Sequence, residues 1–167
     1  MNQQKIRWGI LGCGRIARKF AADLRLVADA ELTAIASRDM HTATMFANDF
    51  PSSYIHNSYE ALATNKEVDV IYIATPHSHH YEHTMLCLQH GKAVLCEKAF
   101  AINSRQATEM IKTACDKKVF LMEALWTKFL PHYNKLQELL SQKMLGDVKS
   151  MLVTFGFKLA PDAPPRL

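Results

Sequence analysis

The sequence predicts an α/β fold in which helices wrap a parallel sheet, followed by the start of a second domain of a different kind. Apolar runs rich in β-branched residues alternate with helical patterns from the N-terminus to Met122. Such alternation is typical of parallel sheets joined by right-handed crossovers. Because it stops after Met122, one domain is expected over residues 1–122 and the beginning of another over residues 123–167.

The strands of the first domain are expected where short apolar runs are bounded by turn residues. The fourth run is especially rich in β-branched residues, and Pro76 ends it because proline cannot continue a hydrogen-bonded ladder. The six expected strands are Ile6–Leu11, Leu32–Ala36, Tyr54–Ile55, Val68–Ala74, Ala93–Cys96 and Val119–Met122.

The segments between these strands carry helical patterns. In the first of them, apolar residues from Ile16 to Val27 recur on one face, which predicts that this face packs on the sheet. The last begins after Asn103, which together with Gln106 resembles a capping box. The expected helices are Ile16–Ala28, Thr42–Phe50, Ser58–Ala63, His79–Gln89 and the segment after Asn103.

Small residues join the first strand to the first helix in the pattern Gly12-x-Gly14-x-x-Ala17. The first glycine permits a tight turn, the second lets the backbone approach a pyrophosphate, and the alanine lets the helix pack close to its strand. The start of the helix adds N–H groups and a positive dipole end. A doubly wound, dinucleotide-binding (Rossmann) domain is therefore predicted, the alternative being a tight turn in a flavodoxin-like domain without cofactor. The predicted contacts in this segment are Gly12, Cys13, Gly14, Arg15 and Ile16.

The end of the second strand predicts which dinucleotide is bound. An acidic residue there would accept the ribose hydroxyls of NAD, whereas this chain has Ser37 and Arg38. Arginine can hold a 2′-phosphate through paired charge-assisted hydrogen bonds, and serine can add a donor. NADP is therefore expected in preference to NAD, although Asp39 next door keeps open the alternative of a merely solvated arginine.

A second pair of residues that could take part in chemistry, Glu97-Lys98, follows the strand that ends at Cys96. In open α/β sheets this is the edge where ligands bind. Lys98 could orient a substrate hydroxyl and the nicotinamide ribose and assist proton transfer, with Glu97 holding its ammonium group. The alternative is an ordinary surface ion pair.

Composition narrows the class of protein. Hydrophobic residues make up 49% of the 167, which argues against disorder, and the net charge of +4 suits an anionic cofactor but is too diffuse to indicate nucleic acid. No apolar run could span a membrane, and the first five residues lack the core of a signal peptide. The four cysteines show no paired spacing, so reduced thiols and a cytoplasmic location are expected.

These segments carry a resemblance. Gly9–Ala17, Ala74–His80 and Glu97–Lys98 resemble the glucose–fructose oxidoreductase/inositol dehydrogenase (Gfo/Idh/MocA) family, while Leu95–Lys98 and Met122–Pro131 are most similar to its dihydrodiol and D-xylose dehydrogenase branch. The resemblance implies a Rossmann domain and then a second α+β domain, whose open, mostly antiparallel sheet carries the substrate site and often a dimer interface. It also implies an NADP-dependent oxidoreductase that moves a hydride between the nicotinamide and a carbinol carbon of a sugar or cyclic diol.

The resemblance also assigns further residues, and the chain departs from it in places. Thr75, Pro76 and His80 would lie on the nicotinamide side of the cleft. Trp126 would wall the substrate pocket, although the residue alone reads equally well as core. Ala99 stands where the family has proline, and Lys128 where it often has arginine.

The family's second acid–base residue has no counterpart before Leu167. This leaves a non-catalytic NADP-binding sensor or subunit as the alternative function. The last expected strand, residues 151–155, and the Pro-rich loop over 160–166 belong to a second domain that is cut short, so the chain is expected to be a fragment or to complete its surface with a partner.

A dense group of histidines, His77, His79, His80 and His83, remains to be explained. Two of them, His79 and His83, share a helix face at i and i+4, a spacing that can bind zinc. Because no cysteine or carboxylate completes an evident set of ligands, no metal is predicted, and a zinc enzyme remains an alternative.

Overall fold

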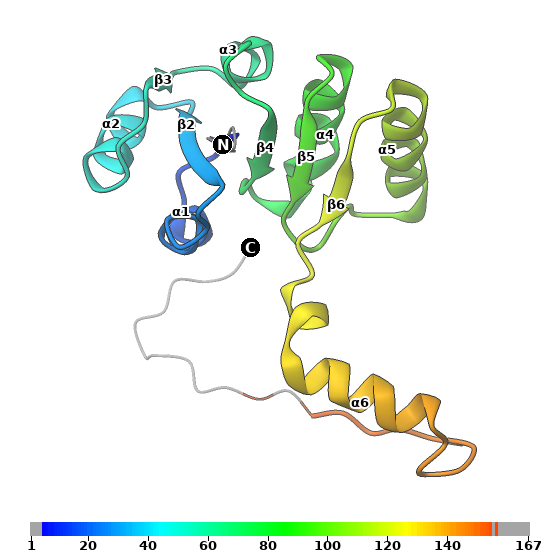
Figure 1. The fold of residues 1–167 in the computed structure, drawn as a ribbon. Coiled ribbons are helices and arrows are strands. Elements are labelled where there is room, and N and C mark those ends of the chain that lie inside the picture. The colour runs from blue at the N-terminus through cyan, green and yellow to red at the C-terminus, as the bar shows by residue number, and fades with distance from the viewer. Residues whose placement is uncertain (1–4, 155, 157–167) are drawn as a thin grey trace. The chain divides into compact units, whose positions relative to one another are not determined.

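The computed structural model of the protein describes residues 5–154 and residue 156 (Figure 1). The chain divides into two compact units, Met1–Leu125 and Trp126–Leu167. Their boundary lies close to the expected one, while the roles of the two parts as cofactor domain and substrate domain stay a prediction.

The first unit contains the predicted parallel sheet. Its six strands run in the order β3-β2-β1-β4-β5-β6, and every neighbouring pair is parallel. The order reverses beside β1, as it does in doubly wound nucleotide-binding sheets. The strands are β1 (Ile6–Leu11), β2 (Ala30–Ala36), β3 (Tyr54–His56), β4 (Val70–Ile73), β5 (Ala93–Cys96) and β6 (Leu121–Glu123).

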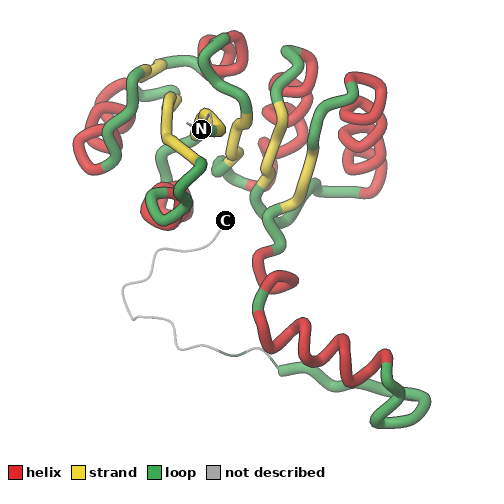
Figure 2. Tube along the Cα trace, viewed as in Figure 1, coloured by secondary structure: helices red, strands yellow, loops and turns green. Residues whose placement is uncertain are grey.

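Helices alternate with these strands along the chain, as the red and yellow segments of Figure 2 show. A short 3₁₀ turn, η1 (His77–His79), precedes the fourth helix, which therefore begins at His80, one residue later than expected. The helices of the unit are α1 (Arg15–Leu24), α2 (Met40–Asp49), α3 (Tyr59–Thr64), α4 (His80–Gln89) and α5 (Ser104–Lys117).

The two faces of the sheet bury separate apolar clusters. On one face, Ala17 and Ala21 of α1 and Phe46 of α2 pack with Ile10 and Tyr72 of the central strands. The other face carries α3, α4 and α5. Its cluster includes Leu62, Leu88 and Ala114 from these helices and Ile71, Ile73 and Val94 from the sheet.

The first helix differs from its prediction. It ends at Leu24 rather than Ala28, and its buried residues are Ala17, Ala21 and Leu24. Ile16 and Val27, the ends of the expected apolar face, are 44% and 46% exposed. The alanines face the sheet because their small side chains let the helix axis come close to the strands.

The second unit begins with the 3₁₀ turn η2 (Trp126–Phe129) and the helix α6 (Pro131–Ser141). Pro131 occupies the first turn of α6, where its missing N–H breaks no hydrogen bond within the helix, and the helix ends at Ser141. The expected strand is wrong over residues 151–154, which form no strand, and Leu152 is 95% exposed. Strand geometry needs a paired neighbour to satisfy its N–H and C=O groups. Phe155 and the expected loop over 160–166 lie outside the described residues.

Among the helices of the described residues, none has the length and apolar character needed to cross a lipid bilayer.

Candidate functional site

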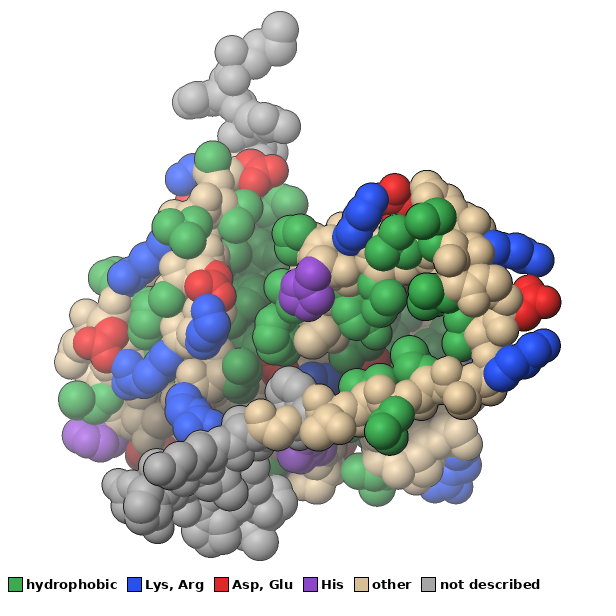
Figure 3. Space-filling view, turned by 90° about the horizontal axis from the view of Figure 1, so that it is seen from below, with side chains coloured by type: hydrophobic (Ala, Val, Ile, Leu, Met, Phe, Trp, Pro, Cys, Tyr) green, Lys and Arg blue, Asp and Glu red, His purple; other side chains and the backbone are tan. Residues whose placement is uncertain are grey.

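The predicted site residues of the first unit gather where the parallel strands end. In Figure 1 the arrowheads of β4 and β5 point downward, so the lower edge of the sheet is its carboxyl edge. Figure 3 views the molecule from below, with lysine and arginine side chains scattered among hydrophobic ones. Ligands of open parallel sheets bind in the crevice at this edge, beside the reversal of strand order.

The turn between β1 and α1 has the geometry that a pyrophosphate requires. Gly12 has φ +97°, and a Cβ there would lie 3.0 Å from Thr75 Cγ2 and 3.2 Å from the Ala74 carbonyl group. A Cβ on Gly14, in contrast, would meet no atom within 4 Å. Packing within the described chain thus explains the first glycine but not the second, and the open space beside Gly14 fits an approaching phosphate.

The amino end of α1 is prepared for an anion. Gly14 is its N-cap, no side chain caps the helix, and the first turn contains no acidic residue. The first N–H groups of a helix lack partners within the helix and carry the positive end of its dipole. A phosphate could therefore accept hydrogen bonds here. Arg15 and Ile16, in the same turn, are exposed. Cys13 is partly buried, and its burial raises the pKa of the thiol to about 11.

At the end of β2 the three neighbouring polar residues are used differently. Asp39 is the N-cap of α2: its carboxylate accepts hydrogen bonds from the backbone N–H of Thr42 at 2.9 Å and from the Thr42 hydroxyl at 2.5 Å. The Thr42 hydroxyl is the main cause of the lowered pKa of Asp39. Ser37 is buried and accepts from Asp39 N–H at 3.3 Å. Arg38 is exposed. Burial raises the pKa of the nearby Tyr59 hydroxyl, and the positive charge of Arg38 partly offsets that rise.

His80 is buried between the loops that follow β4 and β5. Its side chain is 1% exposed, with Nε2 2.8 Å from the Thr75 carbonyl oxygen and Nδ1 2.7 Å from that of Ala99. Both ring nitrogens are therefore engaged within the protein. The residue ties the loop after β4, which carries Thr75 and the exposed Pro76, to the loop after β5.

The pair after β5 divides between interior and surface. Glu97 is buried, and its carboxylate accepts from the Tyr72 hydroxyl at 2.5 Å and from Lys98 N–H at 3.2 Å. The expectation that Glu97 holds the ammonium group of Lys98 is therefore wrong; it holds the backbone instead. Consecutive residues of an extended chain point to opposite sides, which leaves Lys98 exposed at the edge. Burial, together with the hydrogen bond to Glu97, also raises the pKa of Tyr72.

The sequence argument missed two residues that shape this loop. Tyr72 donates to Glu97 from the middle of β4, and Glu123 of β6 accepts from Phe100 N–H at 3.0 Å. Both stabilise the segment around Lys98 from neighbouring strands. The available signal was that Tyr72 lies within a predicted strand and that Glu123 directly follows another, which does not identify a partner.

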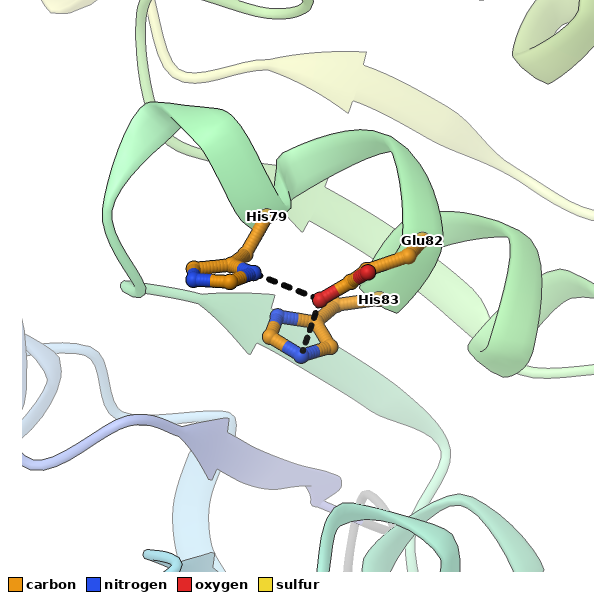
Figure 4. A group of neighbouring side chains, drawn as sticks. All are labelled: His79, Glu82 and His83. Carbon is orange, nitrogen blue, oxygen red and sulfur yellow. Dashed lines mark hydrogen bonds and ion pairs between the residues drawn. The ribbon is translucent and has the colours of Figure 1, made fainter.

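The histidine group also has a neighbour that sequence reasoning overlooked. Glu82 Oε1 lies 2.6 Å from His79 Nδ1 and 3.4 Å from His83 Nε2 (Figure 4). The premise that no carboxylate completes a ligand set is therefore wrong. Trp126, the expected substrate residue, belongs to η2 of the second unit, with its side chain 60% exposed.

Comparison with known proteins decides the family. The model of the Gfo/Idh/MocA family, described as an oxidoreductase family with an NAD-binding Rossmann fold, matches residues 6–125. The chain belongs to this family. Its members have an NAD-binding Rossmann fold, which agrees with the parallel sheet and the glycine turn of this chain.

Named relatives agree with this membership. The trans-1,2-dihydrobenzene-1,2-diol dehydrogenases of Xenopus laevis and Homo sapiens are 44% and 42% identical over 154 and 158 residues, covering 90% and 92% of this chain. The 3-ketoreductase KijD10 from Actinomadura kijaniata, solved with NADP, is 30% identical with a TM-score of 0.80, over 86% of this chain and 46% of that one. The chain spans about half the length of the curated relatives it matches, 46% and 47% of these two.

Proposed function

We propose that this chain is the cofactor-binding part of an NADP-dependent oxidoreductase that acts on a carbinol carbon of a sugar or cyclic diol. The observation that carries the cofactor preference is the use of Asp39 as a helix cap. A carboxylate engaged with Thr42 is poorly placed to accept the ribose hydroxyls of NAD. Arg38, exposed one residue earlier, is left to meet the 2′-phosphate of NADP, with Ser37 beside it.

The other predicted site residues are proposed to bind the pyrophosphate and the nicotinamide or to position the loops around them. The turn from Gly12 to Gly14, with Cys13, Arg15 and Ile16 around it, would hold the pyrophosphate at the start of α1. Thr75 and Pro76 would border the nicotinamide. His80 would act as a positioning residue, since its ring joins the two loops that border the reacting end.

Lys98 is the proposed catalytic residue. The nicotinamide supplies the carbon that exchanges hydride when the cofactor is bound. The ammonium group of Lys98 would orient the substrate hydroxyl and assist transfer of its proton, while Glu97 fixes the backbone that carries it. Trp126 is proposed as a wall of the substrate pocket.

The proposal also covers the oligomeric state, the cellular location and the class of substrate. Exposed apolar residues of the second unit, among them Leu145 and Val153, support a homodimer formed through the C-terminal sheet of the family. The four cysteines are free thiols, which suits the cytoplasm. The substrate is a small molecule, as it is for the dihydrodiol dehydrogenases.

The cofactor assignment is tested by titrating NADPH and NADH into the protein and its Arg38→Ala variant. Loss of one charge-assisted contact should weaken NADPH binding by roughly 1.5–3 kcal/mol, while NADH binding changes little. Arg105→Ala, which removes an exposed arginine of α5 outside the site, serves as the control. Equal losses for both cofactors would contradict the role of Arg38.

A further inference from the structure

The proposed cofactor chemistry leaves one cluster of side chains without a task. His79, Glu82 and His83 project from η1 and the first turns of α4, and one potential ligand atom of each lies within 4.8 Å of the others (Figure 4). Residues spaced i, i+3 and i+4 share a helix face. Two imidazoles spaced i and i+4, with a carboxylate beside them, are a donor set and spacing with which helices bind zinc.

The distances are close to those of a coordination sphere. With metal–ligand bonds of about 2.0–2.2 Å, ligand atoms of a tetrahedral zinc site lie about 3.4 Å apart. His83 Nε2 and Glu82 Oε1 are 3.4 Å apart. His79 Nδ1 and Glu82 Oε1 are hydrogen-bonded at 2.6 Å and would have to separate. Their side chains are 37% and 58% exposed, so small rotations can provide that separation.

A second observation comes from the other side of the His83 ring. Thr75 Oγ1 lies 3.0 Å from His83 Nδ1. If Nδ1 donates to this oxygen, the lone pair of Nε2 faces the carboxylate of Glu82 and no proton separates the two acceptors. A cation between them relieves that repulsion. Metal-binding histidines characteristically donate their other N–H to such an outer partner.

His83 is the most enclosed of the three residues. Its side chain is only 12% exposed, compared with 37% for His79 and 58% for Glu82, so its ring has little freedom to turn away from the other two.

We propose that His79, Glu82 and His83 form a binding site for a divalent transition-metal ion, with zinc the best match to two imidazoles and one carboxylate. The three side chains leave a fourth position for water or an anionic ligand. The site stands on this geometry alone and does not depend on the proposed oxidoreductase activity.

The first experiment titrates Zn²⁺ into the 167-residue chain, purified without a histidine tag and freed of metal with a chelator, by isothermal calorimetry. We expect one ion per chain at this site, and a loss of affinity of about tenfold or more in His79→Ala and in Glu82→Gln. Glu82→Gln keeps the shape of an exposed side chain, so it tests the site with little risk to folding. His90→Ala is the matched control, because His90 contacts Glu60 at 2.8 Å outside the cluster and should leave binding unchanged.

The second experiment uses Co²⁺ as an optical probe, because the chain also has four free cysteines and Cys115 is exposed. A site of nitrogen and oxygen ligands should give visible bands without sulfur-to-cobalt charge transfer. Thiolate bands that disappear in Cys115→Ser would place the ion elsewhere and overturn the proposal. So would zinc binding that is absent from the unmodified chain, or that is equally strong in the unmodified chain and in His79→Ala.

Discussion

At the scale of single residues, the direction of a side chain decides what the residue can do. Glu97 and Lys98 are neighbours, yet one carboxylate lies inside against Tyr72 and one ammonium group lies outside. The sequence locates Lys98 at a strand end from the apolar run before it. It could not identify the partner of Glu97, because Tyr72 lies 25 residues away.

The two glycines of the turn should respond differently to substitution. Gly14→Val places a side chain in open space, so the protein should fold normally but lose affinity for either cofactor, because the branched side chain takes the place of a phosphate. Gly12→Ala should instead destabilise the fold by about 1–3 kcal/mol, because φ is positive and the Cβ would crowd Thr75. Chemical denaturation and NADPH titration of both variants separate the effects; undiminished affinity in folded Gly14→Val would make the turn purely structural.

At the scale of helices and strands, features set by neighbouring residues could be predicted from the sequence, whereas features set by pairing between distant segments could not. The six strands follow from apolar runs, but β6 begins two residues later than expected because its pairing with β5, from Val94 to Cys96, sets its limits. The cap of α5 was visible in the sequence because its two partners are three residues apart.

The cap of α5 can be tested directly. Asn103 Oδ1 accepts from Gln106 N–H at 2.9 Å, and Gln106 Oε1 accepts from Ile102 N–H at 3.4 Å. Asn103→Ala should reduce the free energy of unfolding by about 1 kcal/mol and lower the Tm by about 2–4 °C. Asn103→Asp retains a capping oxygen and should remain near the original Tm; an equal loss in both variants would speak against the cap.

The link between β1 and the start of β4 should make stability depend on pH. The guanidinium group of Arg7 donates to both carboxylate oxygens of Asp69, at 2.8 and 3.1 Å. These hydrogen bonds are the main cause of the lowered pKa of Asp69. A carboxyl group whose pKa is lower in the folded state stabilises it above the unfolded-state pKa of about 3.9. This contribution is lost as the pH falls through the still lower folded-state value.

Asp69→Asn should therefore cost stability at pH 7 and progressively less as the pH falls below about 4. Urea denaturation at a series of pH values measures the difference. Asp116→Asn, which changes an exposed carboxylate of α5, should show no such pH-dependent difference. A gap between the protein and Asp69→Asn that stays constant down to pH 3 would exclude the ion pair as its source.

At the scale of the whole molecule, the residues proposed for cofactor binding and those expected for substrate binding belong to different parts of the protein. The groups proposed to hold the cofactor all belong to the first unit, whereas the chain spans about half the length of its curated relatives. The absence of a strand over residues 151–154 shows why a strand cannot be predicted from its own residues alone: it forms only beside a paired neighbour.

Binding and turnover should therefore separate. The 167-residue chain should bind NADPH, followed by fluorescence, but oxidise no diol or sugar appreciably, followed by absorbance. In a version of the protein extended through a complete second domain, Lys98→Met should reduce kcat by about 10²–10⁴ and change NADPH affinity by no more than a few-fold. Turnover by the 167-residue chain would refute the need for the second domain; an unchanged kcat would remove Lys98 from the mechanism.

The place of β1 in the sheet also governs how this protein is made. The strand is synthesised before both of its neighbours, and one of them, β4, begins only at Val70. Until that segment is synthesised, the edge of β1 that pairs with β4 has no partner strand. Parallel sheets assembled from such distant segments fold late and slowly. Deletions at the N-terminus that reach β1 should accordingly harm expression more than deletions of equal length within α6.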